Sequence, residues 1–172
     1  MPHPRVCIVM GSANDWPVMQ SAADMLGRFH IPYEVTVSSA HRAPQRTLAL
    51  SREAAQRGIQ VFIAGAGGAA HLAGVIASET TVPVIGVPID SSSLQGLDAL
   101  LATVQMPQGV PVATVAIGKA GAANAGILAA QIIALQDPEV AALLCQHKSD
   151  LATGVERAAA QLQAQLQEQH AQ

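Results

Sequence analysis

The feature that most constrains the fold is a regular alternation between short apolar runs and longer helical stretches. Five runs have the composition of β-strands, and we predict them at residues 6–10, 33–37, 60–64, 82–87 and 112–117. Helical patterns follow these runs, at about 15–28, 44–56, from about 70, 94–103 and 120–135. Apolar strands joined by helices form a parallel sheet that is covered on both faces. We therefore expect a three-layer α/β/α fold, flavodoxin-like or Rossmann-like, with a parallel five-stranded sheet.

A C-terminal helical extension follows this alternation. Residues 121–135 are apolar or small nearly all round, which predicts a helix covered by the sheet on one side and by another subunit on the other. Asp137 and Pro138 are suited to be the N-cap and first residue of a further helical segment. Within 155–169, one stripe of apolar side chains predicts an amphipathic helix that docks on another surface: Val155, Ala159, Leu162 and Leu166.

Composition adds an expectation about assembly. Half of the 172 residues are hydrophobic and only 12% are charged, against about 25% in an ordinary soluble domain. Because so few charged residues cannot cover the surface of a small domain, we expect apolar surface to be buried between subunits of a homo-oligomer. We expect a single α/β domain over residues 1–172, with a core at about 5–135 and a helical tail at about 137–169.

Several classes of protein are disfavoured. The net charge is −3 and no cluster of Lys and Arg is present, which argues against a nucleic-acid partner. No apolar run approaches the roughly 20 residues of a membrane span, and the N-terminus has no signal-peptide pattern, so a cytoplasmic protein is expected. Cys7 and Cys145 have no metal or redox spacing and are expected to be two buried thiols.

Polar side chains follow three of the predicted strands, where an open parallel sheet binds its ligands. The polar residues are Ser12, Asn14 and Asp15 after the first strand, Ser38, Ser39, His41 and Arg42 after the second, and His71 after the third. Glycines accompany them, with Gly11 after the first strand and Gly65, Gly67 and Gly68 after the third. Hydroxyls, free backbone N–H groups and an arginine are suited to phosphate, and a carboxylate is suited to ribose hydroxyls. The pattern predicts a site for a sugar phosphate or nucleotide.

Each of these features also has a structural explanation. Ser12 and Asp15 are typical helix-capping residues, Arg42 is equally typical of a surface ion pair, and the glycines permit tight packing of strand and helix. His41 and His71 are the two histidines at strand ends, and histidine is suited to acid–base work near neutral pH.

A dinucleotide-binding fingerprint is a weaker alternative. Residues 65–70 fit G-x-G-x-x-A after a strand, and Asp90 follows twenty residues later. The fingerprint follows the third strand, and a chain of this length leaves little room for a separate substrate domain. A nicotinamide or flavin enzyme is therefore disfavoured.

Four segments together carry a family resemblance: MGSANDW (10–16), SSAHR (38–42), AGAGGAAHLAG (64–74) and QMPQGVPVATVAIGKAGAANAGILAAQI (105–132). In this order and spacing they closely resemble the PurE family of purine biosynthesis in its bacterial form, from about residue 5 to 135. The resemblance implies a mutase that converts N5-carboxyaminoimidazole ribonucleotide (N5-CAIR) to 4-carboxy-5-aminoimidazole ribonucleotide (CAIR), by decarboxylation and recarboxylation. A CO2-dependent aminoimidazole ribonucleotide carboxylase and a non-catalytic nucleotide-binding module remain as alternatives.

The resemblance also implies roles for individual residues. Ser12, Ser39 and Arg42 match the phosphate-binding positions, Asp15 matches the ribose-binding position, and His41 matches the catalytic histidine. The loop over the imidazole and carboxylate matches Gly67, Gly68, His71 and Leu72. The resemblance further implies a homo-octamer that uses no metal and no organic cofactor. The chain departs from the expected pattern at Asn14, where we expect Ser, and at Ala73, where we expect Pro.

Overall fold

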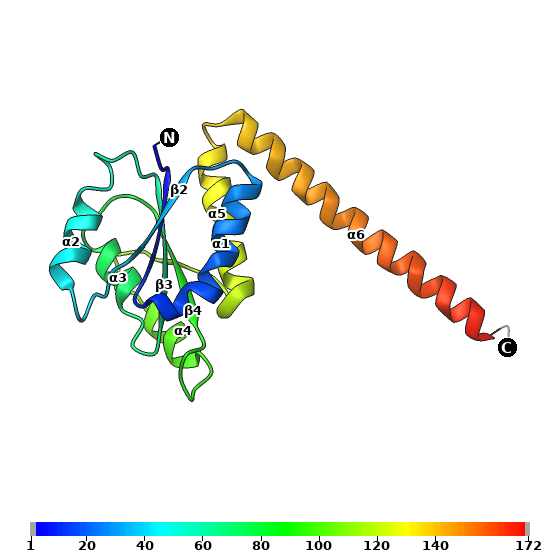
Figure 1. Cartoon of the computed structure of the whole chain (residues 1–172), viewed down its shortest axis with the longest axis horizontal. Coiled ribbons are helices and arrows are strands. Elements are labelled where there is room, and N and C mark those ends of the chain that lie inside the picture. Colours follow the sequence, from blue (N-terminus) through cyan, green and yellow to red (C-terminus); the bar gives the residue numbers. More distant parts are fainter. Residues whose placement is uncertain (1–2, 171–172) are drawn as a thin grey trace.

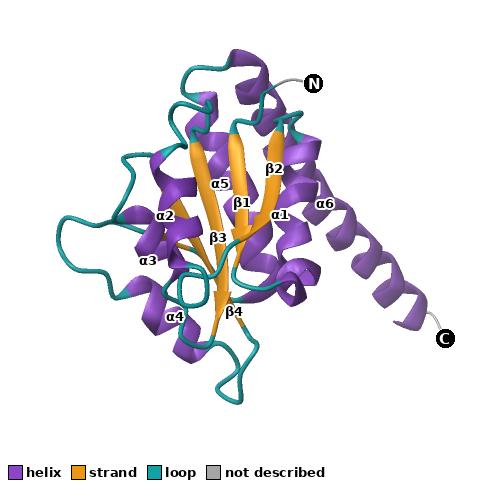
Figure 2. Ribbon diagram, turned by 60° about the vertical axis from the view of Figure 1, so that its left-hand side comes forward, coloured by secondary structure: helices purple, strands orange, loops and turns teal. Residues whose placement is uncertain are grey.

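A computed structural model describes residues 3–170, and its centre is a parallel five-stranded sheet (Figure 2). The strand order is β2-β1-β3-β4-β5, and the strands are β1 (Val6–Met10), β2 (Tyr33–Val37), β3 (Val61–Gly67), β4 (Val84–Ile89) and β5 (Ala113–Thr114). All neighbouring pairs are parallel. This is the flavodoxin-like order, so the predicted fold class is confirmed.

Helices cover both faces of the sheet (Figure 1). They are the short 3-10 turn η1 (Ala13–Asp15), α1 (Trp16–Arg28), α2 (Pro44–Arg52), α3 (Leu72–Ala77), α4 (Leu97–Val104), α5 (Gly118–Ala134) and α6 (Pro138–His170). Successive side chains of a strand point to opposite faces, and two buried clusters result. One joins Ile8, Ile63 and Val87 to α1 and α5, and the other joins Val9 and Phe62 to α3.

The predicted strands and helices differ from the observed ones mainly at their ends. β5 has only two residues instead of the six expected over 112–117, and α2 ends at Arg52 instead of near 56. β2 is not buried on both faces as predicted, because Tyr33, Val35 and Val37 are all exposed. The reason is its place at the edge of the sheet, where β1 is its only neighbouring strand.

The small-residue helix α5 is buried within its own chain. It packs against α1, α6 and the sheet. Its exposed positions are Lys119, Ala120, Asn124 and Gln131, while Ile127, Leu128 and Ile132 are partly buried. Gly126 sits against α1 so closely that an added Cβ would lie 2.8 Å from the carbonyl oxygen of Ala22. Within the chain, α1, the sheet and the first turns of α6 cover much of this helix, and additional cover from another subunit stays a prediction.

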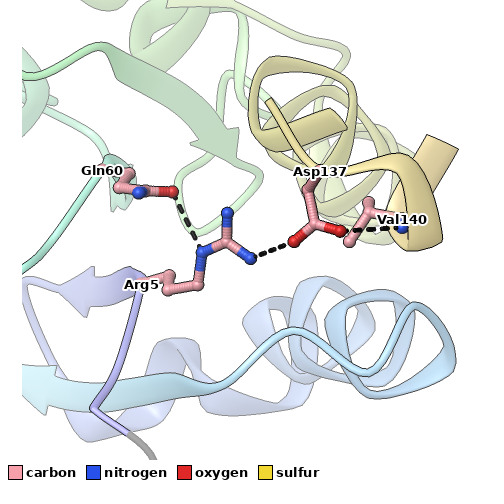
Figure 3. A network of polar contacts seen from close by, with 4 residues as sticks. All are labelled: Arg5, Gln60, Asp137 and Val140. Carbon is pink, nitrogen blue, oxygen red and sulfur yellow. Dashed lines mark hydrogen bonds and ion pairs between the residues drawn. The ribbon is translucent and has the colours of Figure 1, made fainter. Parts of the chain in front are cut away.

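The start of α6 is tied to the sheet by a polar network (Figure 3). Asp137 accepts a hydrogen bond from the Val140 backbone N–H at 3.2 Å, which confirms its predicted role as N-cap. Arg5, just before β1, donates to Asp137 at 2.5 Å and to the Gln60 side chain at 3.0 Å. The network fixes the point at which the chain turns from α5 into α6.

Beyond its first turns α6 leaves the body of the protein (Figure 1). It is one continuous helix of 33 residues, and residues 148–169 are all exposed. The apolar stripe predicted on 155–169 is helical, and its side chains are exposed. Cys145 is also exposed, whereas Cys7 is buried, so the prediction of two buried thiols is wrong for the one on α6.

None of the helices within residues 3–170 combines the length and apolar character that a bilayer crossing requires.

Candidate active site

A cavity of about 370 Å³ opens at the carboxyl ends of the first four strands, at the edge where the sequence predicts a site. Its walls come from the turns after β1, β2, β3 and β4, and they are Gly11, Ser12, Asp15, Ser39, Ala40, His41, Arg42, Ala66, Gly67, Ala69, Leu72 and Ser91. The predicted residues Gly68 and His71 lie outside this lining, although both belong to the loop that follows β3.

The turn after β1 is held by a reciprocal capping arrangement. The Ser12 hydroxyl accepts from the Asn14 backbone N–H at 3.2 Å, and an Asp15 carboxylate oxygen accepts from the Ser12 backbone N–H at 3.2 Å. Ser12 and Asp15 therefore do cap the first helical turn, while both also line the cavity. Burial raises the pKa of the Asp15 carboxyl, opposed by the hydrogen bond from Ser12 and by the nearby Arg42 charge. A carboxyl group whose pKa is raised by burial is typical of a functional site.

Arg42 crosses from the β2 turn to the β1 turn. Its guanidinium donates to the carbonyl oxygen of Gly11 at 2.9 Å, and the Ser39 hydroxyl accepts from its backbone N–H at 3.2 Å. Arg42 forms no ion pair within residues 3–170, so the surface ion-pair alternative is not observed. A guanidinium has five N–H donors, and several of those on Arg42 remain for an anion in the cavity.

His41, which lines the cavity, contacts His71, although 30 residues separate them in the chain. His41 Nε2 and His71 Nδ1 are 2.8 Å apart, and the two rings are nearly perpendicular at 78°. A single hydrogen bond at this distance needs one nitrogen to donate and the other to accept. The geometry couples the tautomer of one ring to that of the other.

The glycines after β3 have separate reasons to be glycine. A Cβ on Gly65 would lie 2.3 Å from the Met19 sulfur, so this glycine serves the packing of α1 on the sheet. A Cβ on Gly67 would lie 1.8 Å from the Ser91 hydroxyl oxygen, and Gly68 has a positive φ of +56°. Gly67 therefore brings the β3 turn against the β4 turn, and Gly68 permits the left-handed backbone that directs the chain toward His71 and Leu72.

Sequence reasoning missed Ser91 as part of the cavity wall. It directly follows Asp90 at the end of β4, so the rule that selected the first three turns would also have found it. In contrast, Ser38 is buried and shares a 2.8 Å hydrogen bond with Thr47, which gives it a structural role. Asn14 is exposed, Ala73 is a buried residue of α3, and neither lines the cavity.

No group of three or more His, Cys, Asp or Glu side chains within residues 3–170 is placed to hold a metal ion. The polar groups of the cavity are instead hydroxyls, one carboxylate, one guanidinium and the imidazole of His41. Such a set provides anion binding at one end and acid–base chemistry beside it.

Comparisons with known proteins identify the family of this chain. The family model described as AIR carboxylase matches residues 5–153. The chain is 59% identical to an N5-carboxyaminoimidazole ribonucleotide mutase of Aliivibrio fischeri over 80% of this chain and 86% of that protein. It is 52% identical to a protein of the same name from Pyrococcus horikoshii over 93% of this chain and 89% of that one.

A solved structure of the same family has the same fold. The crystal structure of Treponema denticola PurE superposes with a TM-score of 0.84 at 28% identity, covering 92% of this chain and 98% of that one. The chain belongs to the AIR carboxylase family, the PurE family that its motifs resemble.

Proposed function

We propose that this chain is a mutase that converts N5-CAIR to CAIR in purine biosynthesis. Its relatives at more than 50% identity carry that name. The observation that carries the proposal is a single cavity shared by His41, Arg42, Ser12 and Asp15. An acid–base group beside an anion-binding set is what transfer of a carboxylate on a phosphorylated nucleoside requires.

In the proposed complex the substrate phosphate binds Ser12, Ser39 and Arg42, and the ribose hydroxyls bind Asp15. The aminoimidazole and its carboxylate then lie against Gly67, Gly68, His71 and Leu72. The Ser12 and Ser39 hydroxyls each accept one backbone hydrogen bond, and each retains its own O–H for donation to a phosphate oxygen. The capping hydrogen bonds hold these groups in place before the ligand arrives, which lowers the cost of ordering them.

The proposed reaction uses one residue, His41, first as an acid and then as a base. The imidazolium protonates the carbamate nitrogen of N5-CAIR as the bond from that nitrogen to the carboxyl carbon breaks. The products are aminoimidazole ribonucleotide and CO2, held together in the cavity. The electron-rich ring carbon then attacks CO2, and neutral His41 removes the proton from that carbon. The ring regains its aromaticity and the imidazolium is regenerated, so protons balance over the cycle.

His71 is proposed to set the state of His41. If His41 is cationic in this pairing, its Nε2–H donates to the Nδ1 lone pair of His71, 2.8 Å away. His71 is then neutral, and the other N–H of His41 is the proton available to the ligand. No metal or organic cofactor enters the proposed reaction.

The test compares formation of CAIR, followed by its ultraviolet absorbance, from two starting mixtures. Freshly made N5-CAIR should give product, whereas aminoimidazole ribonucleotide with modest bicarbonate should give little. Product from the second mixture at a comparable rate would reassign the chain as a CO2-dependent carboxylase. His41→Asn should bind nucleotide but lose turnover, and a fully active variant would refute the acid–base role. No product from either mixture, from a folded protein, would leave only a nucleotide-binding module.

We also propose that the chain forms one α/β domain and assembles as a homo-octamer in the cytoplasm, without a nucleic-acid or membrane partner. Exposed apolar side chains support self-association: Leu97, Leu101 and Val104 on α4, and Leu151, Val155, Leu162 and Leu166 on α6. Such surfaces favour burial between subunits. Light scattering coupled to size-exclusion chromatography measures the mass directly, and a monodisperse monomer would refute self-association.

A further inference from the structure

Ser91 has an unused hydroxyl in the wall of the cavity. Six polar side chains line the cavity, and five of them have hydrogen-bond partners in the protein: Ser12, Asp15, Ser39, His41 and Arg42. Within residues 3–170, the Ser91 hydroxyl is the sixth and has no such partner, and the capping bond to the Leu94 N–H is made by Ser92 instead. Ser91 is exposed, so its hydroxyl is available to a ligand.

The order of the strands places Ser91 on the far side of the cavity from the proposed phosphate site. Ser39 and Arg42 follow β2, Asp15 follows β1, and Ser91 follows β4, in a sheet of order β2-β1-β3-β4-β5. Three strand spacings of about 4.8 Å each separate β2 from β4. A nucleotide with its phosphate at Arg42 and its ribose at Asp15 therefore extends its base toward Gly67 and Ser91.

Close contact between Ser91 and Gly67 makes one wall of these two residues. The Ser91 hydroxyl oxygen occupies the space that a side chain at position 67 would fill, because a Cβ built there would lie only 1.8 Å from it. The hydroxyl is thus held against the backbone at the end of β3, where the loop proposed to cover the imidazole begins.

From this position we propose that Ser91 is a specificity-determining residue: its hydroxyl donates a hydrogen bond to the carboxylate on the ring carbon of CAIR. The assignment rests on the proposed function for the identity of the ligand. A hydroxyl that donates to a carboxylate forms a charge-assisted bond. Aminoimidazole ribonucleotide lacks that carboxylate, so Ser91 favours the carboxylated nucleotide over the decarboxylated one.

The experiment measures the dissociation constants of CAIR and of aminoimidazole ribonucleotide by calorimetry, for the wild-type protein and Ser91→Ala. The variant should bind CAIR roughly tenfold more weakly and aminoimidazole ribonucleotide within twofold of wild type. Ser93→Ala is the matched control, because Ser93 is an exposed serine two residues away that does not line the cavity. It should change neither constant. Ser91→Gly, which also removes the Cβ, should repeat the selective loss.

Two results would overturn the assignment: unchanged CAIR binding by Ser91→Ala, or an equal loss for both nucleotides. Turnover of N5-CAIR by the wild type is measured separately. A wild type that binds CAIR selectively through Ser91 but does not turn over N5-CAIR refutes the proposed function and supports the Ser91 assignment. A wild type that binds neither nucleotide overturns both.

Discussion

Replacing Gly67 by alanine tests whether the contact between the β3 and β4 turns is as tight as the structure indicates. The new Cβ would lie 1.8 Å from the Ser91 hydroxyl oxygen, 2.9 Å from the Ser91 Cβ and 3.1 Å from the carbonyl oxygen of Ile89. The hydroxyl can rotate away. The two β-carbons would still be about 1 Å closer than the optimal separation of carbon atoms, so the turns must move apart.

The expected cost follows from this overlap. Inserting one methyl group into a packed site costs about 1 to 3 kcal/mol, and in a chain of this size each kcal/mol lowers Tm by about 2 to 4 °C. Gly67→Ala should therefore lower Tm by several degrees, measured by calorimetry at a fixed protomer concentration, because association changes the apparent stability.

Two controls separate this mechanism from a general effect of losing a glycine. Gly11→Ala lies in the same cavity with nothing within 4 Å of the added Cβ, so its Tm should stay close to that of the wild type. Adding Ser91→Gly to Gly67→Ala removes both Ser91 contacts and should recover most of the lost stability, giving a coupling of about 1 kcal/mol or more. A wild-type Tm for Gly67→Ala, or no recovery in the double variant, would refute the reasoning.

Three further predictions concern the same site and the two thiols. Arg42→Ala should weaken nucleotide binding by roughly 10- to 150-fold, the range expected for a hydrogen bond to a charged group, and unchanged titration calorimetry would remove Arg42 from the phosphate site. Burial raises the pKa of Asp15 above its ordinary value of 3.8, so the folded state binds this proton more tightly than the unfolded state does. The contribution of Asp15 to folding stability is then fully present below pH 3.8 and is lost as pH rises through the raised pKa. Asp15→Asn should flatten that part of the profile of Tm against pH. An unchanged slope of Tm against pH in the variant would contradict this. Burial also raises the pKa of the Cys7 thiol, so this thiol should react slowly in the folded protein. Mass spectrometry after brief maleimide treatment at pH 7 should find the native protein labelled at Cys145 and not at Cys7, and the denatured protein labelled at both. Rapid labelling of Cys7 in the native protein would show that β1 opens.

Element type could be read from the sequence where burial is periodic or complete. The run 6–10 is apolar throughout, as suits β1 in the interior of the sheet between β2 and β3, and all five of its residues are buried. Asp137 and Pro138 correctly predict the start of α6, because helix capping depends on a few neighbouring residues. The predicted length of β5 is too great, because only Ala113 and Thr114 of the apolar run pair with β4. Pairing depends on the neighbouring strand, which the run itself does not show.

Burial of helices was harder to read, because an apolar face does not say what covers it. The helix over 121–135 packs against α1 and α6 of the same chain, a cover that its small-residue pattern does not specify, and cover from a second subunit stays a prediction. Cys145 was expected to be buried like most free cysteines, but it lies on an outward face of α6.

The candidate site also has features that local sequence predicts and features that depend on distant parts of the chain. The amino-acid pattern is enough to predict which chemical groups are available at the strand ends, because a parallel sheet sends all its carboxyl ends to one edge. Which of these groups contact one another is seen only in the folded chain. It paired His41 with His71 across 30 residues, buried Ser38 against Thr47, and brought Ser91 over Gly67. The physical reason is that such contacts depend on strand order and on loop paths, which a local pattern of residues does not encode.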